Sequence, residues 1–245
     1  MIVDAHVRLG RGREVALEVD ELLATMDLLG IDVTCVAPAE GAIAYHNRQG
    51  NELATRAAAA SGGRLVAYAV ANPWRGADAV AELARARDAG ARALAIDPIL
   101  QGFDLLDGLV DPLLAFAAGH RWPVYVRTGT PPSAVPLPLS LLAARHPEVT
   151  FIMGRSGATD FWIDAAAALR AAPNLIGDTC YAPWDTLLTE LGSDPAITPA
   201  RLVFSTDAPY TVPRSELRRV LDWPIDPELK DRVLGGNMRA LLPDI

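Results

Sequence analysis

Charged side chains that could exchange protons or bind an anion follow several short apolar runs of this sequence. Asp4, His6 and Arg8 alternate in the segment IVDAHVRLG, so all three are expected to face the same side of an extended strand. Later runs end in the same way, at Asp97, Arg127 with Thr128, Arg155 with Ser156, Asp178, and Asp207. A histidine beside carboxylates suits general acid–base catalysis, and guanidinium groups match a carboxylate or a phosphate. These residue types predict acid–base chemistry on a small anionic molecule.

The elements that carry these residues alternate along the whole chain, as in a parallel sheet built from βα units. We expect eight strands, at Ile2–Ala5, Val33–Ala37, Leu65–Ala71, Ala91–Ile96, Val124–Val126, Thr150–Met153, Leu175–Gly177 and Leu202–Ser205. Helices are expected at Val19–Leu29, Asn51–Ala60, Ala77–Ala89, Pro112–Ala118, Leu139–Ala144, Trp162–Ala171 and Ser215–Leu221. Eight strands favour a closed (β/α)8 barrel, a TIM barrel of the α/β class, formed by one domain over residues 1–245.

In such a barrel the carboxyl ends of the strands converge on one pocket, where buried charges must pair with each other or with a ligand. The catalytic candidates are Asp207 and His6. The candidates for substrate binding are Arg8, Arg127, Arg155, Asp97, Asp178, Trp162 and Tyr181. Two Pro-rich segments, Thr130–Pro138 and Ala182–Pro199, lack periodicity and are expected to be long loops at this end of the barrel.

The composition limits the class of protein and of partner. A chain of 245 residues, 51% of them hydrophobic, suits one α/β barrel. The net charge of −8 argues against a surface for nucleic acid or anionic membrane. No apolar run could span a bilayer and no leader is recognisable, so a cytoplasmic protein is expected. Cys35 and Cys180 form no CxxC pair, which argues against a disulfide framework and against structural zinc.

Several other residues are weaker candidates. Aromatic rings near the strand ends could line an apolar wall, although packing at the barrel rim is the more common role of Trp74, Phe103, Trp184 and Tyr210. Cys180 has no histidine nearby in sequence to activate it as a nucleophile. His120 and His146 precede strands and belong to the opposite end of the barrel, whereas His46 follows the second strand and could reach the pocket.

Seven segments together resemble a known family over nearly the whole chain. They are VDAHVR, GRLVAYAVANPW, RWPVYVRTG, HPEVTFIMGRSG, PNLIGDT, RLVFSTDAPY and VLGGNMRALL. In combination they are similar to the amidohydrolase superfamily, in the amidohydrolase-related branch that contains decarboxylases and dicarboxylate lactonases.

The resemblance implies a metal site that this sequence has altered. In the family, the first strand carries HxH, the fifth and sixth strands end in His, and the eighth ends in Asp. His6 and Asp207 match the first histidine and the aspartate, but the other three histidine positions hold Arg8, Arg127 and Arg155. A guanidinium has no lone pair for a metal, so His6 and Asp207 fall short of the three ligands of a catalytic zinc. We therefore expect no metal and no other cofactor.

The expected function is that of a metal-independent hydrolase or lyase. Lactone or ester hydrolysis, decarboxylation, and elimination or cyclisation of a small carboxylate are all compatible, with Asp207 as general base or acid and His6 as its partner. Two alternatives stay open: the arginines mark a catalytically inactive homologue, or they pair with the aspartates in a barrel that only binds a small ligand. The resemblance is compatible with a homodimer, and neither nucleic acid nor a membrane is expected as a partner.

Overall fold

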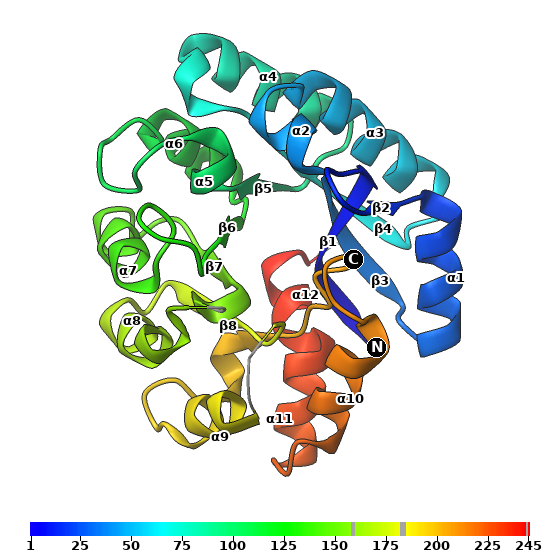
Figure 1. Ribbon diagram of the computed structural model, residues 1–245, viewed down its shortest axis with the longest axis vertical. Helices are drawn as coiled ribbons and strands as arrows, with labels where there is room; N and C mark the ends of the chain where they lie inside the picture. The colour runs from blue at the N-terminus through cyan, green and yellow to red at the C-terminus, as the bar shows by residue number, and fades with distance from the viewer. Residues whose placement is uncertain (158–159, 182–184, 244) are drawn as a thin grey trace.

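Strands and helices alternate around one ring (Figure 1). The computed structural model describes residues 1–157, 160–181, 185–243 and 245, with the backbone alone at 185–187. The strands within these ranges are β1 Val3–Arg11, β2 Ala16–Leu17, β3 Val33–Pro38, β4 Leu65–Ala69, β5 Ala93–Ile96, β6 Val124–Arg127, β7 Phe151–Gly154, β8 Leu175–Asp178 and β9 Leu202–Val203. All eight predicted strands are present. The additional strand, β2, pairs antiparallel with the end of β1.

The strands form one sheet in the order β2-β1-β3-β4-β5-β6-β7-β8-β9, and every pair from β1–β3 onward is parallel. Main-chain hydrogen bonds join β1 to the segment that follows β9. Ala5 donates to Phe204 (2.9 Å), Asp207 donates to His6 (3.0 Å), and Arg8 donates to Ala208 (2.8 Å). These bonds close the ring, so the predicted (β/α)8 barrel is confirmed.

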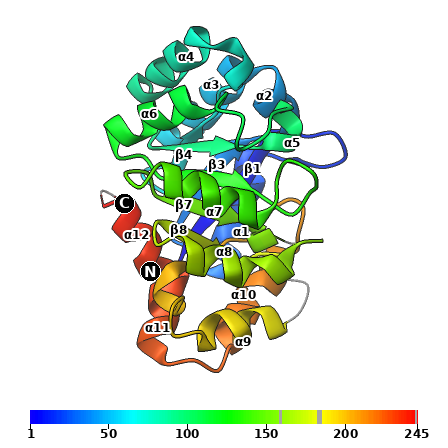
Figure 2. The ribbon, with the colours of Figure 1, turned by 90° about the vertical axis from the view of Figure 1, so that its left-hand side faces the viewer.

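Helices surround the barrel (Figures 1 and 2). Their bounds are α1 Val19–Leu29, α2 Glu40–Ala44, α3 Asn47–Ala60, α4 Ala77–Asp88, α5 Pro98–Gln101, α6 Asp111–His120, α7 Pro136–Arg145, α8 Ala165–Ala171, α9 Asp185–Ser193, α10 Pro213–Asp222, α11 Pro227–Asp231 and α12 Asn237–Leu241. Every predicted helix is present, and α1 has the predicted bounds. None of the helices in the described ranges has the length and apolar character needed to cross a membrane.

The prediction of two long loops is only partly correct. The segment Ala182–Pro199 contains the helix α9, in which Leu188 and Leu191 are spaced three residues apart and are both buried. The segment Thr130–Pro138 ends inside α7, because Pro136 occupies the first turn, where a proline costs no hydrogen bond. In Thr130–Pro138, proline content therefore marks a helix start as well as a loop.

Two apolar clusters separate the inside of the barrel from the layer between sheet and helices. The inner cluster includes Val3, Ala5, Tyr68 and Tyr125, and the outer one fills the space under the surrounding helices. Met238 of α12 also belongs to the inner cluster. The helix α12 therefore closes the amino-terminal end of the barrel and leaves the carboxyl end for the charged residues.

A bulge in β1 changes which of its residues face inward. Asp4 lies opposite Thr34 of β3, but Val7 lies opposite Val36, so β1 contains one extra residue between these pairs. Ala5 and His6 consequently both face the barrel interior, where His6 stacks on Tyr125, and Asp4 faces the outer layer. The expectation that Asp4, His6 and Arg8 share one face is therefore wrong for Asp4, because strict alternation fails at a bulge.

Candidate active site

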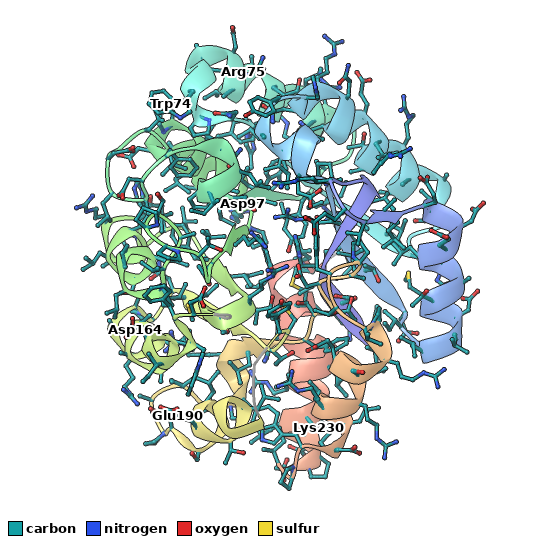
Figure 3. All side chains as sticks on the ribbon, in the orientation of Figure 1. Trp74, Arg75, Asp97, Asp164, Glu190 and Lys230 are labelled. Carbon is teal, nitrogen blue, oxygen red and sulfur yellow. The ribbon has the colours of Figure 1, made fainter. Side chains whose placement is uncertain are left out.

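The charged residues predicted at the strand ends gather at the carboxyl end of the barrel. His6 and Arg8 belong to β1, and Arg127 and Asp178 are the last residues of β6 and β8. Asp97, Arg155 and Asp207 follow β5, β7 and β9. Figure 3 labels Asp97 on the inner side of the ring, whereas the other labelled side chains lie toward its periphery. All seven are linked in the hydrogen-bonded and stacked groups described below.

Two of these residues have an unusual backbone conformation. Arg155 and Asp207 have φ angles of 64° and 51°, in the left-handed region that residues other than glycine seldom occupy. Such strain costs on the order of 1 kcal/mol per residue and persists where surrounding contacts hold it, commonly at functional sites. The sharp turns after β7 and β9 thereby direct both side chains to the same point.

That point is an ion-paired cluster around Asp207. His6 Nδ1 lies 3.1 Å from Asp207 Oδ1, and Arg155 Nε donates to Asp207 Oδ2 at 2.7 Å. Arg155 Nη2 also contacts Oδ2. Because a carboxylate accepts the Nδ1 proton, this contact assigns the proton of a neutral imidazole to Nδ1 and leaves the lone pair on Nε2. Nε2 is thus the proton-accepting atom of the cluster.

The other two arginines share Asp97. Arg8 Nη2 donates to Asp97 Oδ2 at 2.6 Å, and Arg127 Nη1 lies 3.6 Å from the same oxygen. The Nε atoms of Arg8 and Arg127 are buried and have no hydrogen-bond partner within the described part of the chain. Arg127 keeps 20% of its side chain exposed, against 3% for Arg8 and 8% for Arg155. Arg127 is therefore the least completely paired of the three guanidiniums and the one nearest to solvent.

Asp178 forms a third group, made mostly of neutral donors. Its carboxylate accepts hydrogen bonds from Tyr125 Oη (2.9 Å), Ser205 Oγ (2.7 Å) and the main-chain N–H of Cys180 (3.0 Å). The Tyr125 ring also stacks on His6, with centroids 3.9 Å apart and an interplanar angle of 4°. Tyr125 was not predicted from the sequence. Its position two residues before Arg127 on β6 is the signal that could have found it, because alternate residues of a strand face the same side.

Burial and ion pairing shift the pKa values of these groups in opposite directions. Burial lowers the pKa of His6 below its usual 6.5 and outweighs the hydrogen bond to Asp207. Burial would raise the pKa of Asp207, but Arg155, followed by His6, holds it at about 2. Arg8 and Arg127 likewise lower the pKa of Asp97 against the effect of burial. At neutral pH the cluster therefore contains a neutral imidazole among ionised carboxylates and guanidiniums.

Asp4 belongs to the outer face of the sheet, and its pKa is raised where those of Asp97 and Asp207 are lowered. Burial raises its pKa to about 7, although hydrogen bonds from Thr206 and His6 oppose the shift. Burial also raises the pKa of Cys180, whose Sγ lies 3.3 Å from Asp178 Oδ2, so its thiol is a poor nucleophile.

Two tyrosine rings contact the guanidinium of Arg155 at the carboxyl end of the barrel. The guanidinium of Arg155 lies 4.6 Å from the ring centre of Tyr181 and 5.5 Å from that of Tyr210. The Tyr210 hydroxyl contacts Glu40, at the start of α2. Tyr181 thus joins the charged group.

Trp162 is placed elsewhere, since it packs against the outer apolar cluster. Trp184 lies outside the described residues.

The remaining histidines lie away from this cluster. His120 contacts Arg87, and His146 contacts Asp111 and Glu148. His46 lines a separate surface pocket between α3 and α4, with Arg75 and Asp78 among the neighbouring residues.

Sequence comparison identifies the family of this barrel. A family model described as amidohydrolase matches residues 3–243. The chain belongs to the amidohydrolase family. No curated protein sequence matches this amidohydrolase.

Several solved structures share the fold of the amidohydrolase. A 5-carboxyvanillate decarboxylase from Novosphingobium aromaticivorans, complexed with manganese and 4-hydroxy-3-methoxy-5-nitrobenzoic acid, has a TM-score of 0.82 at 14% identity, covering 99% of this chain and 96% of that one. A 2,6-dihydroxybenzoate decarboxylase from Rhizobium has a TM-score of 0.72 at 18% identity (99% and 98%). A 4-oxalomesaconate hydratase from Rhodopseudomonas palustris has a TM-score of 0.75 at 16% identity (99% and 96%). At these identities the similarity establishes the fold alone.

The donors present in this amidohydrolase do not fit a divalent metal ion. Both oxygens of Asp207 are engaged by His6 and Arg155, and Arg155 supplies a positive charge where a metal would need a lone pair. Among the described residues, no group of three or more His, Cys, Asp or Glu side chains is placed to hold one metal ion. Arg8 and Arg127 add further positive charge that would repel a cation.

Proposed function

We propose that this amidohydrolase is a metal-independent enzyme that performs acid–base chemistry on a small carboxylate. The observation that carries the proposal is the hydrogen-bonded pair of His6 and Asp207 placed beside three guanidiniums. Decarboxylation and elimination or hydration are favoured over lactone or ester hydrolysis, because the solved structures of similar fold are named as decarboxylases and a hydratase. Each of these reactions moves a proton to or from carbon or oxygen and develops negative charge near a carboxylate.

In this proposal the imidazole of His6 takes up and releases the proton, and Asp207 holds that imidazole in its orientation. The Nδ1–H bond to Asp207 keeps the lone pair on Nε2, and the stacked Tyr125 ring fixes the plane of the imidazole. Asp207 itself is a weak base at neutral pH, because its pKa is held at about 2. Its role is to stabilise the imidazolium that forms when Nε2 takes a proton.

The arginines then supply the positive charge that a metal supplies elsewhere in the family. Arg127 is the proposed anchor for the substrate carboxylate, since it is the most exposed guanidinium and is only loosely paired with Asp97. Arg8 and Arg155 are tightly paired and stay as fixed charges that stabilise negative charge developing in the reaction. Tyr181 and Tyr210 are proposed to border an aromatic or otherwise planar substrate.

A second candidate function is that of a ligand-binding protein without turnover. It is favoured by the burial of the inner residues, since His6, Arg8 and Asp97 each expose 2% or less of their surface. In this case Arg127 and the tyrosines would bind an anion at the rim, and His6 would serve only to support the barrel.

The decisive experiment compares binding with turnover. The purified protein is treated with a chelator, checked by elemental analysis, and incubated with 2,6-dihydroxybenzoate, 5-carboxyvanillate and 4-oxalomesaconate as probes, while absorbance and released CO2 are followed. We expect turnover of at least one carboxylate that survives chelation. The variant Arg127→Met should weaken binding by about 10- to 100-fold, the loss of roughly 1.5–3 kcal/mol from a charged hydrogen bond.

The control variant is Arg87→Met, which removes a surface arginine that contacts Asp88 and His120 at the other end of the barrel. Binding without turnover of any probe would support the ligand-binding alternative. Activity that disappears with the metal and returns on adding manganese would refute metal independence. Equal affinity in Arg127→Met and wild type would remove Arg127 from the site.

A further inference from the structure

Asp4 lies on the far side of β1 from the proposed active site. It is buried, with 1% of its surface exposed, and it lines a cavity of about 200 Å³ under α1 together with Leu22, Met26 and Ile31. An aspartate buried among apolar side chains is costly unless its oxygens accept hydrogen bonds. The position of these bonds shows what Asp4 does.

The carboxylate of Asp4 bridges the two segments that carry His6 and Asp207. Oδ1 accepts the main-chain N–H groups of His6 (3.2 Å) and Thr206 (2.9 Å). Oδ2 accepts the hydroxyl proton of Thr206 at 2.6 Å. Thr206 precedes Asp207 directly, so one side chain holds the backbone on both sides of the proposed acid–base pair.

This bridge holds the backbone beside Asp207, where the chain is strained and the hydrogen bond to His6 is long. Asp207 has a φ angle of 51°, so its backbone stays in the left-handed region only while its neighbours are held. The Nδ1–Oδ1 distance of 3.1 Å is already near the upper end of the range for an N–H···O hydrogen bond. A shift of β1 against the segment after β9 by a fraction of an ångström would break it.

We propose that Asp4 is a positioning residue that sets, from the outer face of the sheet, the contact between the imidazole of His6 and the carboxylate of Asp207. The inference deepens the proposed function, and its kinetic consequence rests on that function. Its structural consequence, the protonation of His6 at Nδ1 and the hydrogen bond to Asp207, can be measured without a substrate.

The complete bridge requires the ionised form of Asp4, which predominates above its pKa of about 7, because three donors converge on its two oxygens. In Asp4→Asn, the amide must turn its NH2 group toward Thr206 Oγ1, which also accepts the main-chain N–H of Ala208 at 3.3 Å. The Thr206 hydroxyl proton then has no acceptor. Thr206→Val removes the same bond, and with it the longer bond from the Ala208 N–H, with almost no change in shape.

A matched control lies on the neighbouring strand. Thr34 is opposite Asp4 in the β1–β3 register and is fully buried on the outer face. Its hydroxyl has no hydrogen-bond partner within the described residues. Thr34→Val is therefore the same substitution on the same face without loss of a hydrogen bond.

The test is NMR of protein labelled with 15N-histidine, in which a carboxylate bond shifts the His6 Nδ1–H proton downfield. His6→Gln identifies the resonance. We expect Asp4→Asn and Thr206→Val to move this resonance upfield or broaden it beyond detection, and to shift the titration midpoint of His6, while circular dichroism stays unchanged. Thr34→Val should leave the resonance in place. If a substrate has been found, Asp4→Asn and Thr206→Val should each lower kcat at least tenfold and leave KM within about twofold of the wild-type value.

An unchanged His6 resonance in folded Thr206→Val protein would overturn the inference, even if that variant melts at a lower temperature, because Asp4 would then serve stability alone. Absence of turnover with every probe carboxylate would count against the proposed function and leave the NMR result to decide the role of Asp4. If Asp4→Asn fails to fold, Thr206→Val still gives either answer.

Discussion

At the scale of single residues, the proposed site gathers three guanidiniums without becoming uniformly positive. Arg8 and Arg127 share Asp97, and Arg155 pairs with Asp207. Like charges this close are tolerated only with counter-ions between them. Each arginine has an aspartate partner, and the unequal sharing leaves Arg127 as the guanidinium with the most unused hydrogen-bonding capacity.

The pH dependence of activity should report His6. Its imidazole must be neutral to accept a proton, and burial lowers its pKa, so kcat/KM is expected to fall as pH drops through a value below 6.5. Asp207, with a pKa of about 2, stays ionised throughout this range. Asp4, with a pKa of about 7, loses its charge within the range and adds a step near pH 7 through its hold on the His6–Asp207 contact. The profile is measured from pH 4.5 to 9 with the best carboxylate found.

Asp207→Asn provides the control for this profile. An amide NH2 facing Nδ1 would move the imidazole proton to Nε2 and remove the base, with an expected loss on the order of 10⁴-fold in kcat, as for another histidine that loses its orienting aspartate. An acid limb with a single step near pH 7 and none below pH 6.5, or full activity of Asp207→Asn, would rule out His6 as the base held by Asp207.

At the scale of elements, the strand ends were predictable because each apolar run stops at a charged residue, and parallel strands in a barrel end at the same edge. Seven strand-end residues were brought together in this way. The bulge in β1 was not predictable, since VDAHVR has the alternation of a regular strand. The stacking of Tyr125 on His6 was also missed, because it depends on a contact between β1 and β6, which lie far apart in sequence.

Gly154, the last residue of β7, packs against the Tyr125 ring that stacks on His6. A Cβ atom at this position would lie 2.4 Å from Tyr125 Cζ, so the glycine leaves the room that the Tyr125 ring needs beside His6. Gly154→Ala is expected to push the ring off His6, lower the free energy of unfolding by about 1–3 kcal/mol and reduce activity. Urea unfolding and the His6 NMR resonance measure the two effects.

Gly119, in the last turn of α6, is the matched control. A Cβ there meets nothing within 4 Å, so Gly119→Ala should be neutral or stabilise the protein by up to about 1 kcal/mol. If Gly154→Ala left both stability and the His6 resonance unchanged, the close packing of Tyr125 against β7 would not be what holds the imidazole.

At the scale of the whole molecule, the two ends of the chain meet on the barrel. The β1 strand bonds to the segment after β9, and the carbonyl oxygen of Met1 lies 2.3 Å from where a Cβ on Gly235 would be. The following helix α12 places Met238 in the inner cluster with residues of β1 and of the central strands. A barrel closed by its own carboxyl-terminal region should unfold as one cooperative unit, which is the single domain expected from the sequence.

Met238→Ala tests whether the barrel unfolds as one cooperative unit. Met238 is fully buried at the amino-terminal end of the barrel, so its truncation should lower the free energy of unfolding by about 2–5 kcal/mol. Leu28→Ala on α1, where the side chain is 70% exposed, should change it by less than about 0.5 kcal/mol. Because α12 packs against β1, the loss at Met238 should shift the urea midpoint equally for far-UV circular dichroism and tryptophan fluorescence. Two separated transitions would mean that the amino-terminal and carboxyl-terminal halves of the barrel unfold independently, and that the hydrogen bonds between β1 and the segment after β9 do not couple them.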